Sequence, residues 1–236
     1  MEIPAKFLGG ISGELSAEEV DPYINKLLGS DGEELHLDHE EDWVVDRLLH
    51  HSITDVWQTR INKIVRDNNL RDVAGETSCR GNIKQFCLYE NEEHQPNVSE
   101  TLKLLDDDII NFVKLQIKDI TIKNKIIDYD YDLEMTYAWT CIGQKGSFHV
   151  PHTHSRDYPT DVLSTTIYLQ TKPLPKDEID SGLFYYIWRD DRSKIEYIEP
   201  EDGMMLLFPN WLAHGTIPQH AGKRQTFNLS FKVVKK

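Results

Sequence analysis

The sequence lacks the marks of a secreted or membrane-spanning protein. Cysteine is scarce, and the three cysteines, Cys79, Cys87 and Cys141, show neither C-x-x-C spacing nor an even count. We therefore expect reduced thiols with packing roles in a cytoplasmic protein. No apolar run approaches the roughly 18 residues of a transmembrane helix, and the first residues lack a basic segment followed by an apolar run. No membrane partner is expected.

Positive charge is also in short supply. The chain has 26 Lys and Arg residues against 40 Asp and Glu residues, which gives a formal net charge of −14. Nucleic acids and anionic membranes carry charge of the same sign, so neither is expected as a partner. The acidic balance favours a neutral or basic substrate, either a small molecule or an amino-acid or peptide side chain. The sequence gives no indication of an oligomeric state.

The first part of the chain, residues 1–130, is predicted to be mostly helical. Apolar residues recur at steps of three and four over 41–68 and 99–118, and an Asp-Pro cap and a glycine delimit a short helix at 22–28. One strand is expected at 82–89. We expect these helices to form an outer packing layer.

The hydrophobic period changes to two in residues 131–236, which predicts strands. With no linker dividing the chain, we expect a single α+β domain over 1–236, with a β-sandwich or barrel in 131–236 and the helices outside. Strand-like runs cover 133–141, 162–170, 183–188, 204–208 and 225–234. In the first run, alternation predicts one common side for Leu133, Met135, Tyr137, Trp139 and Cys141.

Alternation along the last strand separates an apolar face from a polar one. The polar face would line a cavity, and the amphipathic helices would cover the apolar face. The apolar face comprises Phe227, Leu229, Phe231 and Val233, and the polar face comprises Arg224, Thr226, Asn228 and Ser230.

The stretch HVPHTH contains two candidate metal ligands, His152 and His154. They are two positions apart, so in an extended segment both imidazoles project to the same side and can share a metal. His214, in FPNWLAHG, could supply a third ligand from another strand. Arg224 follows on the polar face, where a guanidinium inside a cavity needs a carboxylate. The cavity is therefore expected to hold a metal and an organic acid.

Other histidines and the tryptophans have structural explanations. His149 is out of phase with His152 on a strand, so we expect it in a loop or on the outer face. The acidic run at 106–108 is expected to be solvated. We expect packing roles for Trp139, Trp188 and Trp211, and structural or surface roles for His36, His39, His50, His51, His94 and His220.

Five blocks in one order resemble the iron(II)/2-oxoglutarate-dependent oxygenases: AWTCIGQKGSFHVPHTH, STTIYLQ, SGLFYYIWRDDR, PEDGMMLLFPNWLAHGTIP and RQTFNLSF. The pattern is most similar to a family found in bacteria and cyanobacterial viruses, and it covers residues 133–236. The resemblance implies a double-stranded β-helix (jelly-roll) core, with iron(II) as the metal and 2-oxoglutarate as cosubstrate. It also implies a dioxygenase that hydroxylates an unactivated C–H bond while 2-oxoglutarate and O2 become succinate and CO2.

The resemblance also implies roles for individual residues. His152 and His214 match iron ligands, and Arg224, with Thr226 beside it, matches the site for the distal carboxylate of 2-oxoglutarate. His154 stands where most of the superfamily has a carboxylate, which would leave the ferrous centre one charge unit more positive. The third ligand stays open. It is His154, or Asp157, or a ligand not identified in the sequence; in the last case His154 could lie behind a water molecule at the third site.

Two other functions fit parts of the pattern. A cupin-like three-histidine iron dioxygenase uses no 2-oxoglutarate, but it has no need of a carboxylate anchor at Arg224. A non-catalytic β-sandwich could bind structural zinc or a small acid, but structural zinc favours four ligands and only three are visible in the sequence. The arginine and the ligand count therefore favour the oxygenase.

Overall fold

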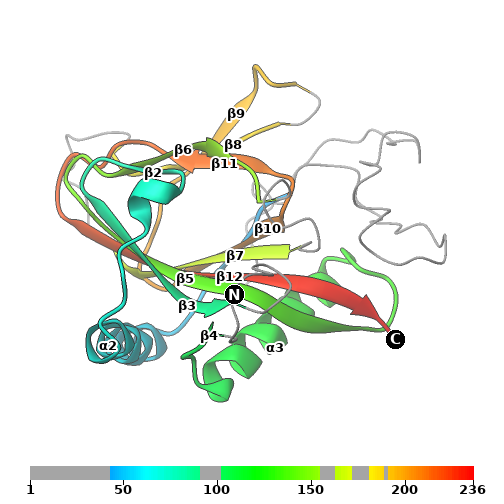
Figure 1. Cartoon of the computed structure of the whole chain (residues 1–236). Coiled ribbons are helices and arrows are strands. Elements are labelled where there is room, and N and C mark those ends of the chain that lie inside the picture. Colours follow the sequence, from blue (N-terminus) through cyan, green and yellow to red (C-terminus); the bar gives the residue numbers. More distant parts are fainter. Residues whose placement is uncertain (1–42, 91–101, 155–162, 172–180, 189–190) are drawn as a thin grey trace.

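The computed structural model of the chain describes residues 43–90, 102–154, 163–171, 181–188 and 191–236. Their strands form two antiparallel sheets in which segments far apart in the sequence lie side by side (Figure 1). The predicted fold class, a double-stranded β-helix core with outer helices, is confirmed. The seven-stranded sheet contains, in order, β1 (Val45–Leu48), β10 (Met204–Pro209), β7 (Leu163–Gln170), β12 (Lys223–Lys235), β5 (Tyr131–Gln144), β3 (Ile83–Glu90) and β4 (Leu102–Lys103). The five-stranded sheet contains β2 (Cys79–Arg80), β6 (Phe148–His152), β11 (Ala213–Thr216), β8 (Phe184–Ile187) and β9 (Ile195–Ile198).

Two long helices, α2 (His51–Asp67) and α3 (Asp107–Lys123), cover the face of the seven-stranded sheet that is turned away from the five-stranded sheet (Figure 1). Trp57 of α2 packs edge-on against Phe227 of β12, with ring centroids 6.2 Å apart. Burial of this apolar layer is the main favourable contribution to folding. The predicted outer face of β12 is confirmed, because the same core cluster contains Phe227, Leu229, Phe231 and Val233.

Both long helices begin later than predicted. Residues Val45–Leu48, expected to be helical, instead pair with β10 as a strand. Val44 and Val45 enter different core clusters, as successive side chains of an extended segment do. The helix predicted over 99–118 begins at Asp107, after Asp106, whose residue type is a preferred N-cap. The helix predicted at 22–28 lies outside the described residues.

None of the helices in the described part of the chain is long and apolar enough to cross a membrane. A short 3-10 helix, η2 (Ala74–Glu76), precedes β2.

β5 does not alternate regularly, because it contains an extra residue. Consecutive residues of β12 pair with Met135 and Tyr137, which leaves Thr136 without a paired residue. A β-bulge of this kind reverses the phase of the strand beyond it. Leu133 and Met135 consequently pack in the helix-covered core, whereas Tyr137 and Trp139 line a cavity between the sheets. The predicted common side for these residues is therefore wrong.

Candidate metal and cosubstrate site

A cavity of about 500 Å³ lies between the two sheets. The five-stranded side contributes His152 at the end of β6, His154 just beyond it, and His214 of β11. These residues form the histidine wall. The seven-stranded side contributes residues of β3, β5, β7 and β12, among them Gln85, Trp139, Tyr168, Arg224, Thr226 and Asn228. The cavity face of β12 is polar, as predicted.

The structure brings together the three histidines of the predicted site. One ring nitrogen of each lies within 4.8 Å of those of the other two. His152 is paired directly with His214 across β6 and β11, and their ring centroids are 4.4 Å apart. The ring centroid of His154 lies 4.9 Å from that of His214 and 5.4 Å from that of His152. Three nitrogens at this spacing suit one divalent ion.

Backbone carbonyls fix the tautomers of two of these rings. Nδ1 of His152 lies 2.9 Å from the carbonyl oxygen of Val150, and Nδ1 of His214 lies 2.8 Å from that of Leu212. A carbonyl oxygen only accepts hydrogen bonds, so each Nδ1 carries the proton. The Nε2 lone pairs are therefore free to bind a metal.

A two-step hydrogen-bond chain fixes the third tautomer. Ser164 donates its hydroxyl proton to Oδ1 of Asn210 over 2.6 Å, so its oxygen accepts from Nδ1 of His154 over 2.7 Å. The backbone carbonyl of Asn210 also accepts a hydrogen bond from the backbone N–H of His154 over 2.8 Å. His154 thus has its Nε2 lone pair free as well. Oxygen partners of this kind orient ligating histidines in metal sites.

Burial keeps two of the three imidazoles neutral. It lowers the pKa of His154 and of His214 well below the usual value, and the neighbouring histidines lower both further. A neutral imidazole has the lone pair that a metal needs, whereas an imidazolium has none.

The opposite side of the cavity carries a buried cation. Arg224 is 5% exposed and donates to the carbonyl of Gly182 over 2.9 Å and to Oγ1 of Thr216 over 3.1 Å. Burial lowers its pKa, and no carboxylate of the described residues forms an ion pair with it. A buried guanidinium without an anion is costly, which indicates a place for an anionic ligand. Thr226, on the same strand, lines the cavity beside it.

Two cavity residues lie outside the predicted site. Burial raises the pKa of Tyr168 to about 12, while the positive charge of Arg224 opposes that shift. Trp139, expected only to pack, lines the cavity and lies edge-on to His154, with ring centroids 5.5 Å apart. The sequence shows only that Tyr168 lies on a predicted strand. Its place in the cavity follows from the pairing of that strand with β12, which the sequence does not show.

His149 lines the cavity, contrary to the prediction of a loop or outer-face position. On β11, Thr216 pairs with His149 and His214 pairs with His152, so three steps on β6 match two on β11. This bulge puts His149 and His152 on the same side, with ring centroids 6.0 Å apart. Asp157, the alternative third ligand, lies outside the described residues.

Comparison with known protein families gives one match. Residues 137–231, somewhat under half of the chain, match the family described as "Putative 2OG-Fe(II) oxygenase". The matched segment includes all the predicted site residues. It confirms the resemblance and, with it, the expected cofactors, iron(II) and 2-oxoglutarate. No protein of curated function matches the chain in sequence.

Solved structures share the fold at low sequence identity. An oxidoreductase of the 2OG-Fe(II) oxygenase family from Burkholderia pseudomallei has a TM-score of 0.57 at 14% identity, over 80% of this chain and 85% of that one. A prolyl-4-hydroxylase from Pseudomonas putida has a TM-score of 0.54 at 15% identity, over 80% and 91%. The viral collagen prolyl hydroxylase of Paramecium Bursaria Chlorella virus-1 has a TM-score of 0.52 at 16% identity, over 84% and 99%. The chain therefore has the double-stranded β-helix fold and, over residues 137–231, the family signature of the 2OG-Fe(II) oxygenases.

Proposed function

We propose that this protein is an iron(II)- and 2-oxoglutarate-dependent dioxygenase that hydroxylates an unactivated C–H bond. One observation carries the proposal: a single cavity has three clustered histidines on one side and, on the other, a buried guanidinium that forms no ion pair with a carboxylate of the described residues. The first group suits a metal ion, and the second suits the carboxylate of an organic acid.

His152, His154 and His214 are the proposed iron ligands. The Nδ1 atom of each ring is hydrogen-bonded to an oxygen atom. The free lone pair of each ring is therefore on Nε2, which can bind the metal. The set contains no negative charge, which favours a cosubstrate that brings one. Iron(II) bound there would supply the oxygen chemistry that converts 2-oxoglutarate and O2 to succinate and CO2.

Arg224 is the proposed anchor for the distal carboxylate of 2-oxoglutarate, with Thr226 as a hydroxyl partner. The guanidinium has five N–H donors, and two of its nitrogens already donate to Gly182 and Thr216. Donors remain for a carboxylate, whose negative charge would offset the cost of burying the cation. A dioxygenase without an organic acid cosubstrate would leave that cost unmet.

The proposed substrate is a neutral or cationic small molecule, or an amino-acid or peptide side chain. The remainder of the cavity includes the aromatic residues Tyr137 and Trp139, and the carboxylate of Glu76 at its edge is already paired with Arg71. The net charge of −14 disfavours polyanions. Two proteins of similar fold are a prolyl-4-hydroxylase and a viral collagen prolyl hydroxylase.

The proposal is tested with full-length protein reconstituted anaerobically with iron(II). Addition of 2-oxoglutarate should produce the visible charge-transfer absorption of an iron(II)–keto acid chelate. Admission of O2 should then yield succinate, measured by mass spectrometry. A His220→Ala variant, which alters an exposed histidine, should behave as the unmodified protein does. Folded, iron-loaded protein that gives neither signal would contradict the proposal.

A second experiment distinguishes the open assignments of the third ligand. His154→Ala should lower iron binding, whereas Asp157→Ala should leave it unchanged. Iron content per chain after gel filtration measures both. If only Asp157→Ala loses iron, the third ligand is the carboxylate and His154 has another role.

A further inference from the structure

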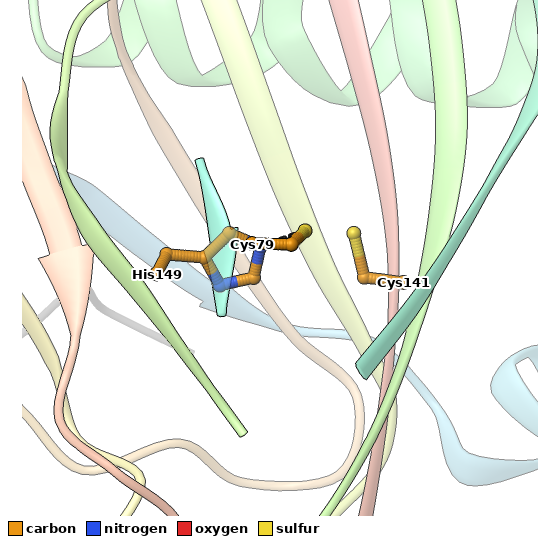
Figure 2. Close-up of side chains that lie close together, drawn as sticks. All are labelled: Cys79, Cys141 and His149. Atoms are coloured by element: carbon orange, nitrogen blue, oxygen red, sulfur yellow. Dashed lines mark hydrogen bonds between the residues drawn. The ribbon is translucent and has the colours of Figure 1, made fainter. Parts of the chain in front are cut away.

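A second group of metal-binding side chains lies beside the histidine wall. Cys79 of β2, Cys141 of β5 and His149 of β6 each offer one ligand atom, and these atoms lie within 4.8 Å of one another. Figure 2 shows the two sulfurs pointing toward each other, with the imidazole of His149 next to Cys79. We call this group the thiol cluster. Both cysteines are free and buried, and both also pack in a small apolar core.

We propose that Cys79, Cys141 and His149 bind a thiophilic divalent ion, zinc(II), at a site separate from the three histidines. The inference goes beyond the proposed oxygenase function, because it requires neither iron nor 2-oxoglutarate.

The spacing of the thiol cluster fits a tetrahedral ion. Sγ of Cys79 lies 3.3 Å from Nε2 of His149. Zinc bonds of 2.3 Å to sulfur and 2.0–2.1 Å to nitrogen at a tetrahedral angle give about 3.5 Å between these two atoms. A disulfide would instead need the sulfurs of Cys79 and Cys141, both of which are free thiols, to close to about 2.0 Å.

Polar groups around the thiol cluster suit a metal. Oε1 of Gln85 accepts from Sγ of Cys79 over 3.1 Å and from Sγ of Cys141 over 3.7 Å, so an amide oxygen is available as a fourth ligand. Nδ1 of His149 lies 3.3 Å from Oγ1 of Thr216, an oxygen partner of the kind that orients ligating imidazoles.

Charge balance favours zinc(II) in this buried place. With the ion bound, two thiolates and one dication would sum to zero charge. The hydrogen bond between the cysteines lowers the pKa of Cys79, and it raises that of Cys141, where burial adds to the rise. Without a metal, therefore, two thiolates do not form together. Thiolate ligands also favour zinc over iron(II), for which imidazoles are suitable ligands.

Cobalt(II) is the probe, because it substitutes for zinc and absorbs light. Full-length apo-protein, with three reduced thiols verified by thiol titration, is titrated anaerobically with cobalt(II). We expect a near-ultraviolet thiolate-to-cobalt charge-transfer band that is displaced by zinc(II). Cys79→Ser and Cys141→Ser should each abolish the band, and the matched control Cys87→Ser should retain it. In a His152→Ala variant the band should persist, because imidazole ligands alone do not produce it.

The outcomes separate the two proposals. A missing band in reduced, folded wild-type protein overturns the zinc site whatever the variants do, so the test does not depend on their folding. A band that survives in both Cys79→Ser and Cys141→Ser overturns it as well. A band without iron-dependent succinate formation would leave the zinc site standing and count against the oxygenase alone.

Discussion

The two sides of the cavity have opposite chemistry. On the five-stranded side, three imidazoles keep their protons on oxygen partners and turn lone pairs toward one another. On the seven-stranded side, Arg224 brings a buried positive charge and N–H donors. The first side suits a cation and the second suits an anion. A metal chelate of a dicarboxylate satisfies both, which explains why the groups face each other and are not mixed.

The largest expected effect is the loss of metal binding when one histidine is removed. His214→Ala deletes the ring that is paired with His152 across the two strands. We expect loss of detectable iron binding and of succinate formation, because two imidazoles cannot complete the set. Iron content per chain and succinate yield measure the result, with His220→Ala as the control. Iron binding that equals that of the unmodified protein would show that His214 is not a ligand.

Removal of the guanidinium should break the anion side alone. Arg224→Ala should retain iron but raise the KM for 2-oxoglutarate, because charge-assisted hydrogen bonds contribute about 1.5–3 kcal/mol. That range corresponds to roughly a 10- to 150-fold increase. Steady-state kinetics and iron content measure the two properties separately. Lys223→Ala, at the adjacent position, is the matched control, and an unchanged KM in Arg224→Ala would reject the anchor.

Loss of the hydroxyl behind His154 should weaken the metal side without deleting a ligand. Ser164→Ala removes the acceptor of the Nδ1 proton of His154, so the free lone pair is no longer held on the other nitrogen. We expect iron affinity to fall about 10- to 100-fold, as for other partners of ligating histidines. The control is Thr165→Ala, which removes a neighbouring buried hydroxyl that donates to a backbone carbonyl instead. Equal losses in both variants would point to general destabilisation.

Acidification should have a smaller effect, which comes from the histidine side: it should lower the free energy of unfolding of the metal-free protein. The pKa values of His154 and His214 are lowered in the folded protein, whereas histidine in an unfolded chain titrates near 6.5. Below about pH 6.5 the unfolded chain therefore binds more protons, and the free energy of unfolding of the metal-free protein should fall as pH falls. Denaturant titrations on either side of this pH measure the slope. It should be shallower in His154→Gln, and an equal slope would refute this origin.

β12 shows what the sequence is sufficient to predict. Every residue of this strand has a partner on β5, so its alternation is uninterrupted from Lys223 to Lys235. The apolar side could be assigned to the helices and the polar side to a cavity from periodicity alone. Sequence position likewise identifies the histidine pair and His214 as candidate ligands, although their proposed roles come from the resemblance.

β5 and β6 show where periodicity fails. Each carries one extra residue beside the cavity, and each led to a wrong face: Trp139 and His149 both line the cavity. A bulge depends on how two strands pair, and no local pattern in either strand announces it. The sequence does not predict the edge strand β1 for a similar reason. Its pairing partner, β10, lies far along the chain.

The unpaired residue of β5, Thr136, also changes which later residues of the strand face the cavity. Thr136 uses its hydroxyl to donate to the backbone carbonyl of Ser230 over 3.2 Å, so the irregular pairing still satisfies that oxygen. Counting positions from Leu133 misidentifies the lining, and only the strand partners identify it. A protein of the same fold could omit one residue here and keep the same faces. Alignments of distant homologues should therefore allow a gap at this point.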